Sequence, residues 1–157
     1  GLNGASLIDD TYNANPDSMK AALDVLATQA GSKIFVMGDM GELGADAAKM
    51  HAEIGVYAKQ KGVDKLLALG ENSVYAVQAF GANATHYASL EANIHAASGL
   101  MQKGVNVLVK GSRFMQMERV VNALENKNTS DINRSDKNTL EKDILKKAVT
   151  KKLLGEN

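Results

Sequence analysis

Polar side chains that could take part in chemistry gather in four short segments of this sequence. These segments are DDTYNANP (9–16), GDMGELG (38–44), GENS (70–73) and KGSR (110–113), and each follows an apolar run. Acids, amides, a lysine and an arginine of this kind could together bind a ligand with both an ammonium and a carboxylate or phosphate group. Each segment alone also has a purely structural interpretation, because Asp, Asn, Pro and Gly build the turns between strands and helices.

The residue types suggest different roles within these segments. The ring of Tyr12 could stack on a base or a sugar, while Lys110, Ser112 and Arg113 come directly before a predicted helix, where an anion binds favourably. The three glycines of GDMGELG allow close approach of the backbone to a ligand. Their spacing matches neither a dinucleotide fingerprint nor a Walker loop, so the sequence gives no independent sign of an ATPase.

The histidines offer little catalytic chemistry. His51, His86 and His95 are too scattered in the sequence for a ligand cluster, which argues against a zinc site. No grouping of serine, histidine and acid suggests nucleophilic catalysis. His51 lies in the helix predicted after GDMGELG and could face the site, although a partly buried structural histidine fits the same pattern.

Short apolar runs that alternate with segments of helical period must position these residues. The alternation is typical of βαβ units and predicts an α/β fold with a mainly parallel sheet of about five to six strands, flanked by helices. The expected strands are 5–9, 33–38, 65–70, 84–88 and 105–111, and the expected helices are 16–31, 45–61, one after the third strand, 90–103 and 114–124. In such sheets ligands bind at the carboxyl ends of the strands, where all four polar segments fall.

The composition changes near residue 124 and indicates a second part of the chain. Residues 125–139 are rich in Asn, Asp, Ser and Lys and almost free of apolar residues, which predicts a flexible linker. A helical period returns in TLEKDILKKAVTKKLLG, with many lysines opposite its apolar stripe. We therefore expect residues 1–124 to form a domain and residues 125–157 to form a polar linker followed by a terminal amphipathic helix. This helix would pack weakly on the domain or contact a partner chain. Because the sequence lacks an initiator methionine, we also expect it to come from a longer protein.

The overall composition narrows the class of partner. Lys plus Arg and Asp plus Glu both number 18, so the charge balance gives no sign of nucleic acid or an anionic membrane surface. No apolar run reaches the roughly 18 residues of a membrane span, and there is no cysteine for disulfides or thiolate metal sites. These features predict a soluble, cytoplasmic protein that binds a small molecule or another protein.

Three motifs, in this order, resemble one known family. DDTYNANPDSM (9–19), VMGDMGELG (36–44) with a histidine downstream, and VLVKGSR (107–113) with a glutamate at 118 are similar to the C-terminal domain of the Mur ligases. Among these ligases the motifs are most similar to the type that adds D-alanyl-D-alanine to UDP-N-acetylmuramoyl-tripeptide in peptidoglycan synthesis. The resemblance covers residues 5–124 and leaves the tail from 125 onward without a counterpart.

The resemblance implies a Rossmann-like, three-layer C-terminal domain of a cytoplasmic, ATP-dependent ligase. A central domain, absent from this chain, would bind ATP and Mg²⁺, and the C-terminal domain would close over them. ATP would phosphorylate the carboxylate of the tripeptide, and the amine of D-alanyl-D-alanine would attack the acyl phosphate. The isolated chain is then expected to be inactive and to contribute positioning and exclusion of water, with no catalytic residue and no metal ligand of its own.

The resemblance also assigns residues position by position. Asp10 would face the nucleotide ribose, with Tyr12, Asn13 and Asn15 at the same ATP and closure interface. The D-alanyl-D-alanine pocket would comprise Asp39, Met40, Glu42, Leu43, Lys110, Ser112 and Arg113, with His51 as a further candidate. In such a pocket an acid could hold the ammonium group of the dipeptide, and Arg113 or Lys110 its carboxylate.

Two other classes fit parts of the sequence. A phospho-receiver domain also has an acidic pair after its first strand and a lysine after its fifth, but it needs an aspartate at the end of the third strand. That place reads LLALGENS, with a glutamate and an asparagine instead. A non-catalytic α/β interaction module, whose polar edge meets another protein, is the second alternative.

Overall fold

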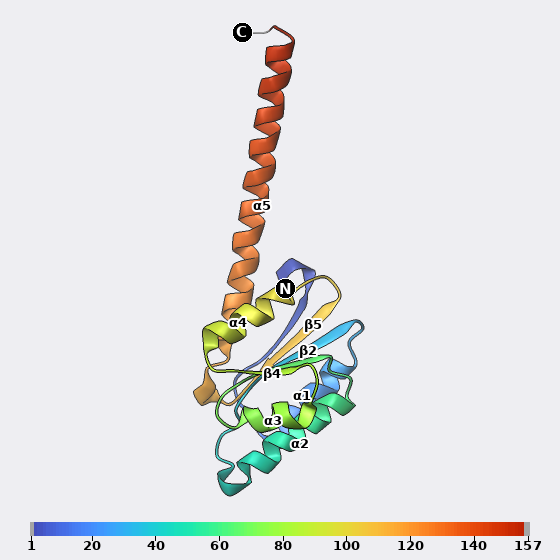
Figure 1. Ribbon diagram of the computed structural model, residues 1–157, viewed down its shortest axis with the longest axis vertical. Coiled ribbons are helices and arrows are strands. Elements are labelled where there is room, and N and C mark those ends of the chain that lie inside the picture. Colours follow the sequence, from blue (N-terminus) through green and yellow to red (C-terminus); the bar gives the residue numbers. More distant parts are fainter. Residues whose placement is uncertain (1, 156–157) are drawn as a thin grey trace. The chain divides into compact units, whose positions relative to one another are not determined.

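One parallel sheet forms the centre of the molecule up to residue 125 (Figure 1). Its five strands lie in the spatial order β1 (Ser6–Asp10), β5 (Val105–Lys110), β2 (Ser32–Gly38), β3 (Lys65–Leu69) and β4 (Ala84–Tyr87), and each neighbouring pair is parallel. The computed structural model describes residues 2–155, and side chains at residues 3–126 and 138–155. The α/β fold predicted from the sequence is confirmed, with five strands among these residues.

Helices cover both faces of the sheet and give three layers (Figure 1). One face carries α1 (Pro16–Ala27), α2 (Ala47–Gln60) and α3 (Ser73–Phe80), and the other carries α4 (Leu90–Gly99) and the first turns of α5 (Glu118–Leu153). Short 3₁₀ turns lie at η1 (Leu2–Gly4), η2 (Gly44–Asp46) and η3 (Arg113–Met115). The sheet is therefore covered on both faces, as parallel sheets require.

The central strands alternate between two hydrophobic cores. In β2, Val36 faces the core shared with α4 and α5, whereas Phe35 and Met37 face the core shared with α1, α2 and α3. In β5, Val109 belongs to the first core and Leu108 to the second. Because both sides of these strands are buried along most of their length, their sequences are mainly apolar, and this makes them recognisable in the sequence.

The turn before α1 has the capping chemistry that its sequence predicts. The Asn15 side chain accepts a hydrogen bond from the Ser18 N–H at 2.8 Å, and the Ser18 hydroxyl accepts one from the Asn15 N–H at 3.0 Å. Pro16 occupies the first helical position, where it loses no hydrogen bond. This reciprocal cap fixes the point at which the chain leaves the sheet edge and enters the helix.

The last helix begins later than its apolar period predicts. Residues 113–115 form η3, Gln116 has a left-handed φ of 51°, and α5 begins only at Glu118. Met117 is fully buried, and a Cβ placed on Gly38 would lie 2.7 Å from its sulfur. The segment before α5 therefore packs as a loop across the carboxyl end of the sheet.

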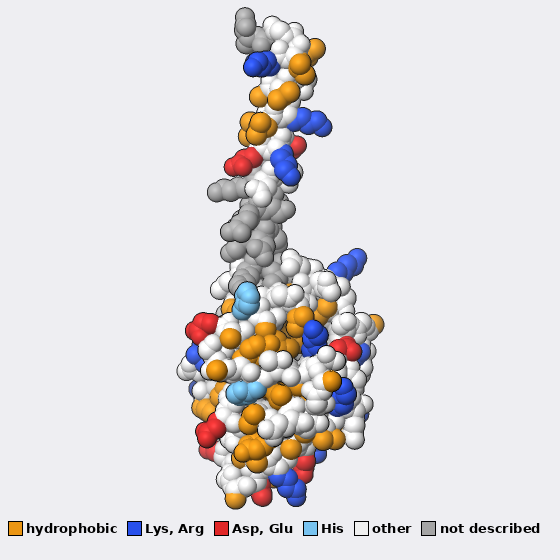
Figure 2. Space-filling view, viewed as in Figure 1, with side chains coloured by type: hydrophobic (Ala, Val, Ile, Leu, Met, Phe, Trp, Pro, Cys, Tyr) orange, Lys and Arg blue, Asp and Glu red, His pale blue; other side chains and the backbone are white. Residues whose placement is uncertain are grey.

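The tail is helical where the sequence predicts a linker. α5 continues through residues 125–139, and no Gly or Pro interrupts it between Glu118 and Leu153. The chain divides into two compact units, 1–125 and 126–157. Figure 2 shows exposed hydrophobic side chains interspersed with lysines along the described part of the second unit. Neither α5 nor any other helix in the described part of the chain is long and apolar enough to cross a bilayer.

Candidate functional site

Three polar loops meet at one edge of the sheet because their strands are neighbours. β5 lies between β1 and β2, so the loops at 11–15, 39–43 and 111–116 leave the sheet next to one another. The fourth polar segment, 70–73, follows β3, the next strand along. The parallel sheet thus brings together segments that are far apart in the sequence, at the edge where such sheets bind ligands.

Three hollows border these loops. The first, which we call the loop hollow, has a volume of about 460 Å³ and is lined by Asn13, Ala14, Asn15, Gly41, Glu42, Leu43, Ser112, Arg113 and Phe114. The second, which we call the α1 hollow, has a volume of about 400 Å³ and is lined by Asp10, Tyr12, Asn13, Asn15, Lys110 and four residues of α1. The third has a volume of about 460 Å³, lies between the loops at 11–15 and 111–116, and is lined by Asp9, Asp10, Thr11, Tyr12, Arg113 and Glu118. Of the three, the loop hollow alone contains residues from all three loops. The hollows adjoin one another: Asn13 and Asn15 line both the loop hollow and the α1 hollow, and Arg113 also lies beside Asp10 and Tyr12.

Ser112 joins the three loops through its hydroxyl and its backbone. The hydroxyl accepts a hydrogen bond from the Gly41 N–H at 2.6 Å and donates one to the Ala14 carbonyl at 3.2 Å. The Ser112 N–H donates to the Asp39 carbonyl at 2.9 Å. Because a hydroxyl can donate and accept at once, this one small, buried side chain fixes the spacing of the loops around the loop hollow.

The carboxylate of Asp39 is engaged by the start of α3. One oxygen accepts the N–H and the hydroxyl of Ser73 at 2.7 and 2.6 Å, and the other accepts the Asn72 N–H at 2.9 Å. The side chain is buried, and a negative charge is favourable at a helix N-terminus. A Cβ on Gly70 would lie 2.4 Å from an Asp39 oxygen, so glycine is required beside this carboxylate. Asp39 therefore ties the loop after β2 to the segment after β3.

His51 supports the same loop from α2. Its Nε2 accepts a hydrogen bond from the Met40 N–H at 3.0 Å, which places the ring proton on Nδ1, 2.6 Å from the Ala47 carbonyl. His51 is fully buried, and its Nε2 lies 3.9 Å from an Asp39 oxygen. Met40 is buried as well. Both candidates thus hold the loop from inside the protein.

Lys110 is a buried cation at the end of β5. Its ammonium group donates to the Asn13 carbonyl at 2.8 Å and lies 3.0 Å from an Asp10 carboxylate oxygen. The Lys110 side chain is 2% exposed, whereas that of Asp10 is 44% exposed. The two residues are also direct partners in the register of β1 and β5. Lys110 therefore holds one side of the Asp10 carboxylate, while the other side remains open to solvent.

The exposed candidates are the groups that can meet a ligand. Glu42, with a left-handed φ of 60°, and Arg113 are both exposed and both line the loop hollow. The guanidinium carbon of Arg113 lies 5.5 Å from the centre of the Tyr12 ring, within the range of a cation–π contact, and Tyr12 is 75% exposed. Leu43, which is half-buried, adds apolar surface to the same hollow. The loop hollow thus presents one carboxylate and one guanidinium.

The sequence does not predict three residues of the loop hollow. Ala14 and Gly41 contribute through their backbone groups, which carry no signal in the sequence. Phe114 is 65% exposed, although its apolar type and its place in a helical period favour a buried position. The left-handed residue at Gln116, which separates η3 from α5, is the local feature that removes Phe114 from the helix.

The described side chains offer no ligand set for a metal ion. Among the residues that the structure describes, no group of three or more His, Asp or Glu side chains is arranged to hold one.

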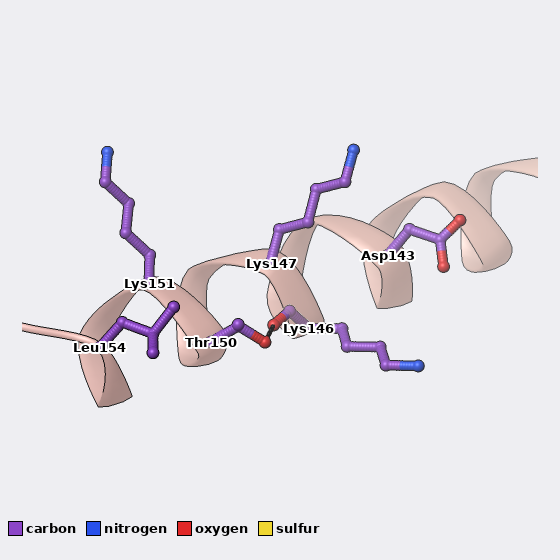
Figure 3. A pocket seen from close by; sticks show the side chains of 6 residues that line it. All are labelled: Asp143, Lys146, Lys147, Thr150, Lys151 and Leu154. Atoms are coloured by element: carbon purple, nitrogen blue, oxygen red, sulfur yellow. Dashed lines mark hydrogen bonds between the residues drawn. The ribbon is translucent and has the colours of Figure 1, made fainter. Parts of the chain in front are cut away.

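A further hollow on the tail helix lacks the features of a site. It is lined by Asp143, Lys146, Lys147, Thr150, Lys151 and Leu154, all from α5 (Figure 3). Lys147 and Lys151 point to one side of the helix and Lys146 to the other, so these charges do not converge (Figure 3). The Thr150 hydroxyl donates to the Lys146 carbonyl at 3.0 Å, a bond within the helix. We assign no ligand to this surface.

Comparison with known proteins identifies similar sequences for the first unit. Residues 1–113 match a family model described as Mur ligase, glutamate ligase domain. A UDP-N-acetylmuramoyl-tripeptide--D-alanyl-D-alanine ligase from Escherichia coli (strain K12) is 42% identical over 125 residues, covering 78% of this chain and 27% of the relative. The ligase of the same name from Buchnera aphidicola subsp. Acyrthosiphon pisum is 38% identical over 120 residues, covering 75% of this chain and 26% of the relative. The chain thus spans about a quarter of the length of these relatives.

Solved structures give the same match. The MurF ligase from Thermotoga maritima in complex with ADP has a TM-score of 0.74 at 25% identity, covering 83% of this chain and 30% of that chain. MurF from Acinetobacter baumannii has a TM-score of 0.72 at 34% identity, covering 79% of this chain and 29% of that chain.

Proposed function

The chain belongs to the Mur ligase family, and we propose that it is the C-terminal domain of a ligase that joins D-alanyl-D-alanine to UDP-N-acetylmuramoyl-tripeptide. The observation that carries this proposal is the meeting of the three motif loops around one hollow that presents Glu42 and Arg113. Relatives with this activity in their names are 42% and 38% identical to the chain. We propose that the complete ligase uses ATP to form a peptide bond. The isolated domain is expected not to catalyse this reaction.

The loop hollow suits a small zwitterionic dipeptide. D-alanyl-D-alanine carries an ammonium group at one end and a carboxylate at the other. The Arg113 guanidinium can bind the carboxylate through two parallel hydrogen bonds, and the Glu42 carboxylate can hold the ammonium group. Leu43 and Phe114 offer apolar surface for the methyl groups. A volume of about 460 Å³ lies within the range of small-molecule sites.

The buried candidates would act by holding the loops. Asp39, Met40, His51 and Ser112 have their polar groups engaged inside the protein. We therefore propose that these residues hold the backbone of the loops in place around the dipeptide and do not contact the dipeptide themselves. Such placement has catalytic value, because an amine held in attack geometry near an activated carbonyl reacts without a further loss of translational and rotational entropy.

The α1 hollow would face the nucleotide and the partner domain that closes on it. Asp10, Tyr12, Asn13 and Asn15 all line this hollow, and Tyr12 presents an exposed ring to solvent. The Thermotoga maritima relative was solved with ADP bound. ATP would supply the phosphoryl group that activates the tripeptide carboxylate, and Mg²⁺ and most of the nucleotide would be held outside this chain. We place the reaction in the cytoplasm, where ATP is available.

The tail would not take part in the ligase reaction. We propose residues 1–124 as the ligase domain and 125–157 as an appendage, a division that agrees with the boundary between the two compact units at residue 125. Removal of residues 126–157 should leave the urea unfolding midpoint of the domain unchanged. Loss of cooperative unfolding in the truncated chain would reject the division.

A chimeric ligase tests the proposed function. Residues 1–125 of this chain replace the matching segment of the Escherichia coli relative, and ADP release is measured with ATP, Mg²⁺ and UDP-N-acetylmuramoyl-tripeptide. We expect ADP release that requires D-alanyl-D-alanine. Release that is independent of the dipeptide, or a folded chimera without activity, would overturn the proposal.

Substitution of Arg113 tests the assignment of the loop hollow in the same chimera. Arg113→Gln should raise the KM for the dipeptide about tenfold and change the KM for ATP less than about twofold, because the lost group binds the dipeptide carboxylate. The matched control is Lys103→Gln, which removes a positive charge from an exposed residue just before β5, at the opposite end of that strand, and should change neither KM. Equal effects of Arg113→Gln on both substrates would contradict the assignment.

A further inference from the structure

The KGSR motif predicts that Lys110 belongs to the dipeptide pocket, but in the structure Lys110 lines the α1 hollow. It does so together with Asp10, Tyr12 and Asn13, and it does not line the loop hollow, whereas Ser112 and Arg113 of the same motif do. Arg113 also lies beside Asp10 and Tyr12 in the third hollow. We propose that Lys110 is a positioning residue for the nucleotide half of the site: it fixes the Asp10 carboxylate and the Asn13 carbonyl and does not bind the dipeptide. This inference rests on the proposed function, since it takes Asp10 as a residue that faces the nucleotide.

The surroundings of the ammonium group exclude a direct role with the dipeptide. Its two partners, an Asp10 oxygen at 3.0 Å and the Asn13 carbonyl at 2.8 Å, already satisfy most of its bonding capacity. The side chain is 2% exposed, and a cation removed from water in this way is stable only while it stays paired. A dipeptide carboxylate would have to displace one of these partners to reach Lys110. The exposed guanidinium of Arg113 is accessible without any such displacement.

The two groups that Lys110 binds, the Asp10 carboxylate and the Asn13 carbonyl, lie on either side of the exposed residue Tyr12 in the sequence. On one side of Tyr12 in the chain, the Asp10 carboxylate is held through one oxygen and remains 44% exposed. On the other side, Lys110 holds the Asn13 carbonyl, two residues before Asn15, the N-cap of α1. A single buried cation therefore sets both the direction of the free Asp10 oxygen and the path of the backbone that carries Tyr12. Both groups belong to the nucleotide side of the proposed site.

Steady-state kinetics of the chimeric ligase test this role. Lys110→Met keeps the apolar stem and removes the charge, and it should raise the KM for ATP about tenfold while changing the KM for the dipeptide less than about twofold. Lys110→Gln can still donate a hydrogen bond to the Asn13 carbonyl and should show the same selective rise in the KM for ATP. This variant replaces Lys110→Met in the test if Lys110→Met does not fold. The control is Lys33→Met, since Lys33 also donates to a backbone carbonyl, that of Gly31 at 3.2 Å, but lies at the opposite end of the sheet. A rise in the KM for the dipeptide as large as that for ATP would overturn the inference.

A double-mutant cycle separates positioning from direct contact. If Lys110 acts mainly through Asp10, Lys110→Met should change the KM for ATP less than about threefold in an Asp10→Asn background. Fully independent effects of the two substitutions would show that Lys110 does not act through Asp10, which also overturns the inference.

Amide hydrogen exchange in the 157-residue chain tests the division without turnover. Lys110→Met should accelerate exchange of the Ala14 N–H, which donates to the Asn13 side chain at 2.8 Å, at least about threefold. The N–H groups of Met40 and Gly41, which are held by His51 and Ser112, should keep their exchange rates. Equal acceleration in both loops would refute the division whatever the chimera does, whereas an inactive chimera with the expected exchange pattern would count against the proposed function alone.

Discussion

Replacing Asp39 by asparagine tests whether this acid supports the fold or meets the ligand. The substitution keeps the size of the side chain but changes one carboxylate oxygen into an NH₂ group. In the native protein the two oxygens accept three hydrogen bonds, from the Asn72 N–H, the Ser73 N–H and the Ser73 hydroxyl. Whichever way the amide turns, its NH₂ group faces at least one backbone N–H, so a donor then points at a donor.

The expected loss of stability follows from these contacts. One charge-assisted hydrogen bond contributes about 1.5–3 kcal/mol to the free energy of unfolding. The interaction of the charge with the N-terminus of α3 contributes about 0.3–1 kcal/mol more. Because Asp39 and Ser73 are both buried, water does not replace the lost partner. Asp39→Asn should therefore lower the free energy of unfolding by about 3 kcal/mol.

Urea unfolding of the whole chain, followed by far-ultraviolet circular dichroism, measures this loss. The matched control is Asp64→Asn, because the Asp64 carboxylate accepts a single hydrogen bond, from the Lys33 N–H at 2.8 Å, in an exposed position. The free energy of unfolding of this control variant should fall by less than about 1 kcal/mol. If Asp39→Asn also lost less than about 1 kcal/mol but no longer bound D-alanyl-D-alanine, the carboxylate would serve the ligand and its structural assignment would be wrong.

Three further substitutions test the stability of the fold, the first two by urea unfolding and the third by thermal unfolding at different pH values. Gly70→Ala should cost about 2–4 kcal/mol, because its Cβ would lie 2.4 Å from the Asp39 carboxylate at a φ of +115°, whereas Gly81→Ala, with a φ of +86° but no atom within 4 Å, should cost only about 1 kcal/mol. Asn93→Leu should leave stability unchanged or raise it by about 1–2 kcal/mol, because both polar atoms of this buried amide lack a hydrogen-bond partner within the described part of the chain; a clear loss would contradict this. The Tyr57 hydroxyl donates to Asp24 at 2.6 Å and lowers the pKa of that carboxyl, so its contribution is present at neutral pH and lost as the pH falls below about 4. Melting temperatures of the native chain and Tyr57→Phe should accordingly differ near neutral pH and converge in acid, and a constant difference would refute the linkage.

The sequence predicts the fold well because the physical causes are local or regular. Each central strand is apolar on both faces, as the burial of Phe35, Val36 and Met37 requires, and the glycines and the Asn15 cap mark the ends of helices. The position of the polar loops then follows from the rule for parallel sheets. The tail is the exception, since a polar composition does not distinguish an exposed helix from a linker when Gly and Pro are absent from it.

The division of labour within the site is less predictable from the sequence. An acid and a lysine in a loop can bind a ligand or hold the protein together, and the residue type is the same in both cases. The partner of Lys110 at Asn13 is 97 residues away, and the partners of Asp39 at Asn72 and Ser73 are 33 and 34 residues away. Burial and pairing of this kind are consequences of tertiary structure, so they become visible only when the strands are placed side by side.

The strand order also determines when the site can form during synthesis of the chain. β1 lies at one edge of the sheet, and its strand neighbour is β5, with Ser6 opposite Asn106. In a nascent chain, β1 therefore has no neighbouring strand to pair with until residues 105–110 have left the ribosome. Pairing the two strands closes a long loop of the chain, which is a slow step in folding. The bonds from Lys110 to Asn13 and from Ser112 to Ala14 form in that same step. The sheet and the site are thus completed together, and a product that ends before β5 would have neither.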